Sequence, residues 1–145
     1  MTNEEFVELA CPHSWFLVAD DLHGQAVELR QSFGQGHLTH HDYRSGNKAS
    51  WDNTNRSTFL LASFALENAI KAFLVYENPG WISNGKLSKF LKSHKLTDLA
   101  EKSTNIPYKT KGRGTLKAFE DGNESWARYP CALSKETSAQ PSTLD

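Results

Sequence analysis

The sequence predicts an all-α protein that folds as an antiparallel up-down bundle of four to five helices. An apolar run at residues 58–76 has helical periodicity, and amphipathic segments lie on both sides of it. No segment alternates apolar and polar residues as a half-buried strand does. A chain of 145 residues has the size of one domain. We expect this domain to span 1–133 and to be followed by a small polar tail at 134–145 that is disordered.

The run at 58–76 is the centre of the predicted fold. Its large apolar side chains surround most of a helix, so neighbouring helices must cover it on several sides. Ser63, Glu67 and Lys71 interrupt the run at a spacing of four, and we expect this stripe to be the one face in water. Glu67 and Lys71 also stand in the favoured order of an i,i+4 ion pair.

The flanking helices are predicted from their periodicity and their stop signals. A short helix is expected at 3–10, and a longer one from 14 to 33. Residues 84–103 form one helix or two short ones broken near 93–94. The last helix is predicted to run from Thr115 to Pro130, after a basic loop.

The connection at 34–56 is long, polar and rich in Gly, Asn, Ser and His. A loop of this length in a small domain is functional or disordered. It holds the one metal-like cluster of the chain, His37, His40, His41 and Asp42. Adjacent histidines rarely point the same way and no second cluster offers further ligands, so we expect no metal and no cofactor.

Charge is distributed unevenly along the chain. Residues 1–31 carry six acids and one base, whereas residues 86–117 carry nine bases and two acids. This asymmetry indicates a polyanion partner or complementary packing between copies, and a merely solvated face is the alternative. The basic residues form a ridge and a loop: Lys86, Lys89, Lys92 and Lys95, then Lys109, Lys111 and Arg113.

Cellular location is predicted from cysteines and hydropathy. Cys11 and Cys131 lie near opposite ends without metal-site spacing, so a reducing compartment is the default. Polar residues interrupt the central run before it reaches the length of a membrane span. The N-terminus is acidic where a signal peptide would be basic. We therefore expect a cytoplasmic protein without a membrane partner.

Three local patterns occur in order along the chain. They are AlxxAIKAFLV at 65–75, sHkLxdL at 93–99 and WxRYP at 126–130. In this order and spacing the chain resembles the HEPN-domain proteins over residues 57–131, with 14–32 as the first bundle helix.

This resemblance implies a bundle of four or five helices that is commonly a homodimer. Many members are RNases of toxin–antitoxin, phage-defence or RNA-processing systems, often beside a minimal nucleotidyltransferase. Others bind nucleotides or act as scaffolds. Active members carry an R-x4-6-H motif, whose histidine acts as general base or acid on the ribose 2′-hydroxyl while the arginine steadies the phosphorane.

The chain departs from that motif. The positions after Arg128 where histidine belongs, 133–135, hold Leu, Ser and Lys. Arg30 and His37 have an allowed spacing, but the family does not usually keep its motif there. His94 is either catalytic or, as a cap or packing histidine at a helix junction, structural.

Arg128 and Tyr129 form a further candidate site. They line an anionic cleft, or Arg128 is structural and pairs with Glu67 or with the C-terminal end of a neighbouring helix. The leading expectation is an RNA- or nucleotide-binding protein that uses the basic residues and Tyr129, with a homodimer, an antitoxin or a nucleotidyltransferase as protein partners. A metal-independent endoribonuclease is the second hypothesis, and a non-catalytic dimeric interaction or scaffold module is the alternative.

Overall fold

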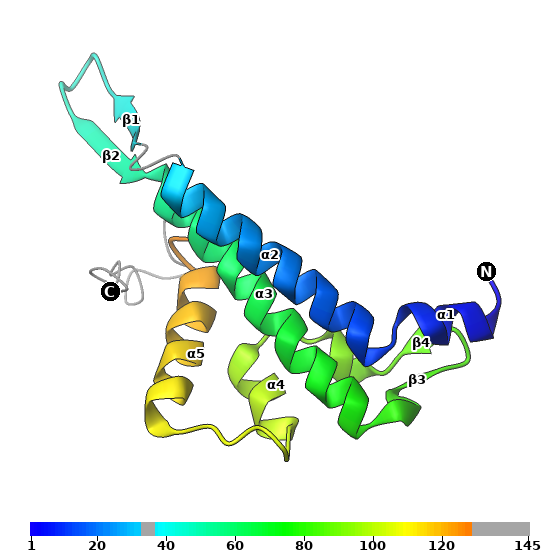
Figure 1. Cartoon of the computed structure of the whole chain (residues 1–145). Helices are drawn as coiled ribbons and strands as arrows, with labels where there is room; N and C mark the ends of the chain where they lie inside the picture. The colour runs from blue at the N-terminus through cyan, green and yellow to red at the C-terminus, as the bar shows by residue number, and fades with distance from the viewer. Residues whose placement is uncertain (33–36, 129–145) are drawn as a thin grey trace.

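The computed structural model describes residues 1–32 and 37–128, and of residues 37–38 and 51–55 the backbone alone. Helices dominate this part of the chain, as predicted (Figure 1). The helices are α1 (Asn3–Leu9), α2 (Pro12–Ser32), α3 (Asn53–Glu77), α4 (Leu96–Lys102) and α5 (Thr110–Asn123). The strands are β1 (His37–His41), β2 (Lys48–Asp52), β3 (Ile82–Ser83) and β4 (Lys86–Leu87), and two 3-10 turns are η1 (Pro79–Trp81) and η2 (Lys89–Lys92).

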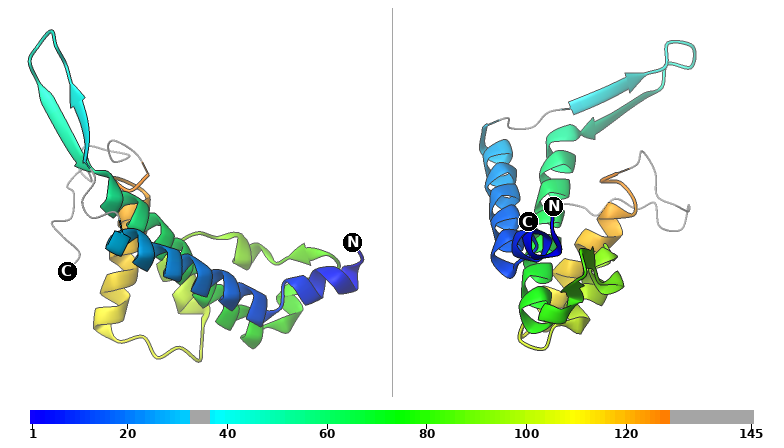
Figure 2. Two further views of the ribbon diagram at one scale, coloured as in Figure 1. Left: turned by 45° about the horizontal axis from the view of Figure 1, so that its top comes forward. Right: turned by 90° about the vertical axis from the view of Figure 1, so that its right-hand side faces the viewer.

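Two long helices, α2 and α3, run antiparallel side by side (Figures 1 and 2). Ala19 and Ala26 are the buried residues of α2, and their seven-residue spacing places them on one face. Ala65 and Ala72 repeat that spacing on α3 and are also buried. Small side chains on the facing sides allow the two helices to approach closely.

A second layer covers the other side of α3. Here η2, α4 and α5 enclose the main core with Leu74, Leu91 and Leu99, which are fully buried. The Glu120 carboxylate of α5 accepts hydrogen bonds from the Thr97 backbone N–H (2.9 Å) and hydroxyl (2.6 Å) in the first turn of α4. This contact caps α4 and ties it to α5.

The prediction that the polar stripe of α3 faces water is wrong. Ser63, Glu67 and Lys71 are buried, because the stripe faces the second layer, where Lys71 pairs with Glu67 and Ser63 accepts from Asn123. The sides of α3 that no element covers expose three aromatic residues instead: Phe64, Phe73 and Tyr76.

Residues 34–56, predicted as a loop, contain a β-hairpin. β1 and β2 pair antiparallel, with His37 opposite Asp52 and His41 opposite Lys48. The hairpin projects beyond the end of the α2–α3 pair (Figures 1 and 2). The register places the three apolar residues of the strands, Leu38, Ala49 and Trp51, on one face, and an alternation this short is a weak signal in the sequence.

The boundaries of the C-terminal half also differ from prediction. The break near 93–94 is confirmed, but a 3-10 turn and not an α-helix precedes it. α5 begins at Thr110 and ends at Asn123, so Gly112 and Gly114 lie inside it. The predicted stop at Pro130 and the predicted tail at 134–145 lie outside the described residues.

α3 is also apolar enough, by length and composition alone, to cross a membrane. The segment Arg56–Glu77 has a mean hydropathy of 1.5, and half of the window is buried. Its contacts with α2 on one side and α4 and α5 on the other account for this composition, since the central helix of a packed core has the same properties.

Candidate functional site

The buried centre of the site is the ion pair between Glu67 and Lys71 on α3. The Lys71 Nζ lies 2.6 Å from the Glu67 Oε1, and the two side chains are 5% and 11% exposed. The predicted i,i+4 pair is thus confirmed. The Lys71 Nζ also lies 5.8 Å from the centre of the Trp15 ring on α2. The ammonium therefore has a carboxylate and an aromatic face as neighbours.

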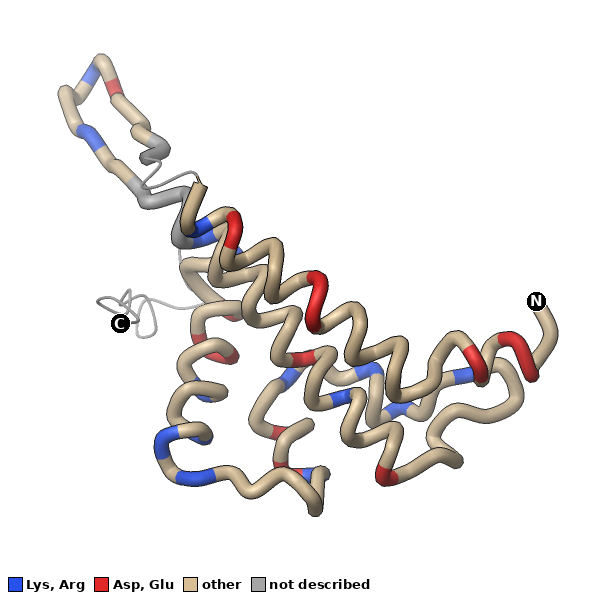
Figure 3. Tube along the Cα trace, viewed as in Figure 1, with Lys and Arg blue, Asp and Glu red and all other residues tan. Residues whose placement is uncertain are grey.

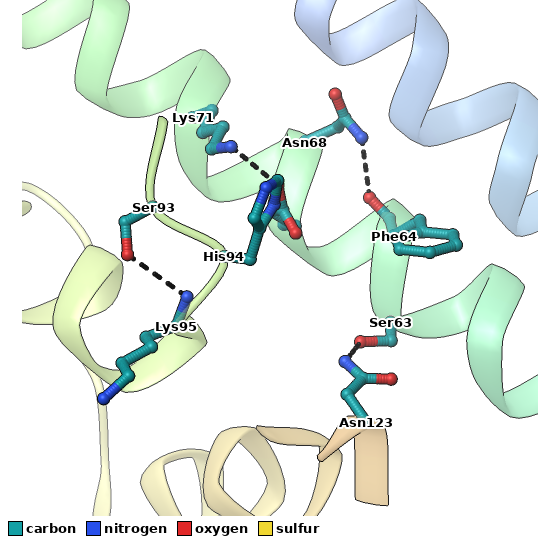
Figure 4. Close-up of polar contacts among 9 residues, drawn as sticks. Ser63, Phe64, Asn68, Lys71, Ser93, His94, Lys95 and Asn123 are labelled. Carbon is teal, nitrogen blue, oxygen red and sulfur yellow. Dashed lines mark hydrogen bonds and ion pairs between the residues drawn. The ribbon is translucent and has the colours of Figure 1, made fainter. Parts of the chain in front are cut away.

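His94 completes the cluster from the surface. Its Nδ1 lies 3.0 Å from the same Glu67 oxygen that Lys71 contacts, although the imidazole is 79% exposed (Figure 4). The Ser93 hydroxyl accepts a hydrogen bond from the Lys95 N–H (3.2 Å), and this turn presents His94 toward α3. This exposure differs from the partly buried packing histidine that was the structural alternative, whereas the hydrogen bond to Glu67 is a structural contact.

This arrangement favours proton transfer at the outer nitrogen of His94. A carboxylate that accepts from Nδ1–H fixes the neutral tautomer in which Nε2 carries the lone pair. Because the side chain is exposed, Nε2 is the nitrogen that meets a ligand from solution. An imidazole in this tautomer has the chemistry that a general base requires, a lone pair on a nitrogen that faces solvent.

The basic ridge, Lys86, Lys89, Lys92 and Lys95, leads along the chain toward His94. All four lysines are exposed, and Figure 3 shows their segments following one another along β4, η2 and the turn before α4. Lys89 and Lys92 lie in the 3-10 turn, where residues three apart stand one above the other. The Lys89 and Lys92 side chains therefore add charge on one side of the turn.

A second basic group lies at the start of α5. Lys109 is the N-cap residue, Lys111 and Arg113 follow in the first turn, and all three are exposed. Figure 3 places this group apart from the basic ridge. Cations at the positive end of a helix oppose its dipole, so they raise the local potential and do not stabilise the helix.

The structure does not assemble an arginine–histidine pair from the described residues. Arg30 is exposed in the last turn of α2, and His37 opens β1 with its side chain outside the described part. Arg128 is exposed after α5 and does not pair with Glu67, whose partners are Lys71 and His94. Tyr129 lies outside the described residues.

The histidine-rich hairpin has no metal-site geometry in its described side chains. His40 and His41 are neighbours in β1, so they project to opposite faces. The His41 ring lies 4.3 Å from the Tyr43 ring. Asp42 accepts from the Arg44 N–H and the Ser45 hydroxyl within the turn, and these bonds lower the pKa of Asp42. Across the described residues, no three His, Cys, Asp or Glu side chains converge on one point.

Sequence reasoning missed the role of three residues near the site. Trp15 was assigned only to an apolar stripe, yet it contacts Lys71. Phe90 and Lys102 come together with Lys89 through the 3-10 turn, and the Lys89 and Lys102 ammonium groups lie over the Phe90 ring. Helical spacing gave no signal for this last contact, because Phe90 and Lys102 belong to different elements.

Comparison with known proteins adds no assignment to this geometry. No family model, no curated protein and no solved structure shows a significant match to the chain. The function is therefore inferred from the residues of the site.

Proposed function

We propose that this protein is a HEPN-like helical protein that binds RNA or a nucleotide along the basic ridge that ends at His94. The observation that carries the proposal is the exposed ridge beside an imidazole held by a buried carboxylate. Lysine ammonium groups neutralise phosphates, and protonated His94 adds a charge-assisted donor. The lysines of the second basic group extend the positive field that attracts the polyanion.

The family part of the proposal is supported by the placement of the three patterns. The first lies in the middle of the central helix α3, the second at the start of α4, and the third begins after α5. The first two meet where Glu67 and His94 form their hydrogen bond.

A binding titration at two ionic strengths tests the proposal. The amount of single-stranded RNA that the protein retains on a filter should fall steeply as the salt concentration rises, because each phosphate contact releases counterions. The charge reversal Lys89→Glu with Lys92→Glu should weaken binding by about 10-fold or more and flatten the salt dependence. Lys48→Glu on the projecting hairpin is the matched control. Binding that is absent or independent of salt refutes the proposal.

The second candidate function is a metal-independent endoribonuclease, favoured by the Glu67–His94 contact. His94 Nε2 would take the proton of the ribose 2′-hydroxyl, and the 2′-oxygen would attack the neighbouring phosphorus. The bond from phosphorus to the 5′-oxygen breaks, and that oxygen takes a proton from water, leaving a 2′,3′-cyclic phosphate and a 5′-hydroxyl end. Glu67 orients the imidazole and stabilises its protonated form.

Incubation with tRNA and total RNA in a chelator tests this candidate. His94→Ala should abolish cleavage and Glu67→Gln should reduce it by about 100-fold. Arg30→Ala, His37→Ala and Arg128→Ala test the remaining predicted catalytic residues. Intact RNA with the wild type, or equal cleavage by every variant, removes the enzyme candidate and leaves the binding function.

The third candidate is a dimeric interaction module, which is favoured by exposed apolar residues on the α2–α3 pair. Phe16 and Val27 lie three helical turns apart on α2, and Phe73 and Tyr76 lie one turn apart on α3; all four are at least 40% exposed. Exposed apolar clusters mark interaction surfaces. The proposed occupant is a second copy in the cytoplasm, and an antitoxin or nucleotidyltransferase partner would compete for the same surface.

A further inference from the structure

Phe90 combines a partly exposed aromatic ring with two cations that form no ion pair with any described residue. Its side chain is 39% exposed in η2, while the next residue, Leu91, is 1% exposed in the core. The Phe90 ring lies 5.0 Å from the Trp81 ring, with 36° between their planes. The Trp81 ring therefore supports Phe90 from the protein side, so the ring is held in place.

Two ammonium groups lie over this ring. The Lys89 Nζ is 5.3 Å and the Lys102 Nζ is 5.9 Å from the ring centre. Within the described part of the chain, neither lysine forms an ion pair. Lys102 also donates to the Asp98 carbonyl (3.2 Å), which leaves two of its three donors for a ligand.

We infer that Phe90 is a stacking platform for an unpaired nucleobase whose phosphate is bound by Lys89 and Lys102. This inference rests on the proposed RNA- or nucleotide-binding function and names the ligand class. Every base has a π-face that stacks on an aromatic ring, and lysines at the rim bind the phosphate attached to the same nucleotide. In the free protein the ammonium groups occupy the ring face by cation–π attraction. A bound base takes that face while the flexible lysine side chains turn to the phosphate.

The platform selects single strands over duplexes. In a double helix the base faces are stacked on one another and the ring cannot reach them. The basic ridge alone would bind both forms through their phosphates. A preference for unpaired bases that depends on Phe90 therefore separates the platform from the ridge.

Fluorescence anisotropy with three labelled RNAs of about 10 nucleotides tests the inference. The probes are a single strand, a duplex of the same length and a strand of abasic ribose phosphates. Phe90→Leu keeps an apolar side chain and should weaken the single strand by about 10-fold, leaving the duplex and abasic probes unchanged. Phe90→Trp, which keeps an aromatic ring, should bind the single strand as the wild type does. Tyr43→Leu, which removes an exposed aromatic ring from the hairpin, is the matched control, and circular dichroism checks each variant for folding.

The outcomes separate this inference from the proposed function. If Phe90→Leu binds the single strand as the wild type does while Lys89→Glu with Lys92→Glu weakens it, the platform is refuted and the ridge stands. If the wild type binds none of the three RNAs and no mononucleotide, both fail. A titration with uridine monophosphate distinguishes the source of the base. Binding of either ligand that depends on Phe90 supports the platform. If uridine monophosphate saturates the site and the single-stranded RNA does not bind, the ligand is a free nucleotide.

Discussion

Among single residues, Glu77 organises the turn between α4 and α5. Its carboxylate accepts from the Ser103 hydroxyl (2.8 Å) and from the backbone N–H groups of Asn105 (3.0 Å) and Thr104 (3.2 Å). Burial alone would raise the pKa of Glu77, but the three hydrogen bonds together lower it. The same charge, together with burial, raises the pKa of the Tyr108 hydroxyl, which has no hydrogen-bond partner.

Glu77 should make the fold sensitive to acid. A carboxyl whose pKa is lowered in the folded state stabilises it above the ordinary value of about 4.5, and this contribution is lost as pH falls through the lowered pKa. Urea unfolding at pH 7 and at pH 3 should therefore show a smaller pH dependence in Glu77→Gln than in the wild type. Glu101→Gln, an exposed carboxyl on α4, is the control. An unchanged pH dependence in Glu77→Gln contradicts this role.

Gly122 has a packing role that its helix propensity did not reveal. An added Cβ at this position would overlap the Phe59 ring, whereas Gly114 in the same helix faces open space. Gly122→Ala should destabilise the protein by about 1–3 kcal/mol through overpacking. Gly114→Ala should stabilise it by about 0.5–1 kcal/mol through its helix propensity. Urea denaturation measures the change in the free energy of unfolding for both variants. If Gly122→Ala stabilises the protein as much as Gly114→Ala does, the Phe59 ring moves aside freely.

Among the elements, α3 shows what a sequence pattern determines and what it leaves open. Its helical state followed from apolar periodicity, and its Glu67–Lys71 pair followed from spacing. The apolar periodicity did not determine which side of α3 faces inward, because a helix could bury either the polar stripe or the aromatic sides. The orientation depends on tertiary packing, because Ile70, Leu74 and Val75 of α3 are buried against leucines of η2, α4 and α5.

The other elements were also predicted only where the sequence carries a local signal. α1 and α2 carried local signals, a capping box at Thr2 and Glu5 and a proline at the start of α2, and both helices were predicted within two residues of their start. The projecting hairpin carried only a weak signal, because its strands are five residues long and mostly polar. Phe90 lies in a 3-10 turn that leaves it 39% exposed, and no helical spacing in the sequence indicates this position. The candidate site was therefore predicted as separate residues and not as an assembly.

The buried polar stripe of α3 yields a prediction for double variants. Lys71→Met alone leaves the Glu67 carboxylate in a buried site with only the exposed His94 as partner, and it should cost about 3 kcal/mol. Lys71→Met with Glu67→Leu removes both charges and should return to within about 1 kcal/mol of the wild type. Chemical denaturation of the two singles and the double measures the coupling. Additive losses would show that the pair is not energetically linked.

In the whole molecule, charge and apolar surface are arranged in complementary regions. The acids of residues 1–31 lie on α1 and α2, and the lysines of the basic ridge lie in the second layer (Figure 3). A two-fold axis brings the same residues of each copy into reciprocal contact. A pair of copies related in this way would cover the exposed apolar residues of α2 and α3.

This arrangement predicts a homodimer in solution. Phe16→Ser combined with Phe73→Ser removes one aromatic ring from each helix and should shift the mass measured by light scattering from dimer to monomer, with unchanged helix content. Leu9→Ser, an exposed apolar residue of α1, is the control. A wild type that is monomeric over the whole accessible concentration range contradicts the dimer proposal.

The Glu67 oxygen that Lys71 and His94 share connects the surface of the protein with its interior. The Lys71 Nζ lies 2.6 Å and the His94 Nδ1 3.0 Å from this oxygen, and the same Nζ lies 5.8 Å from the centre of the Trp15 ring. If an anion binds at His94, we expect the fluorescence of Trp15 to change in the wild type and to stay constant in a variant without Lys71.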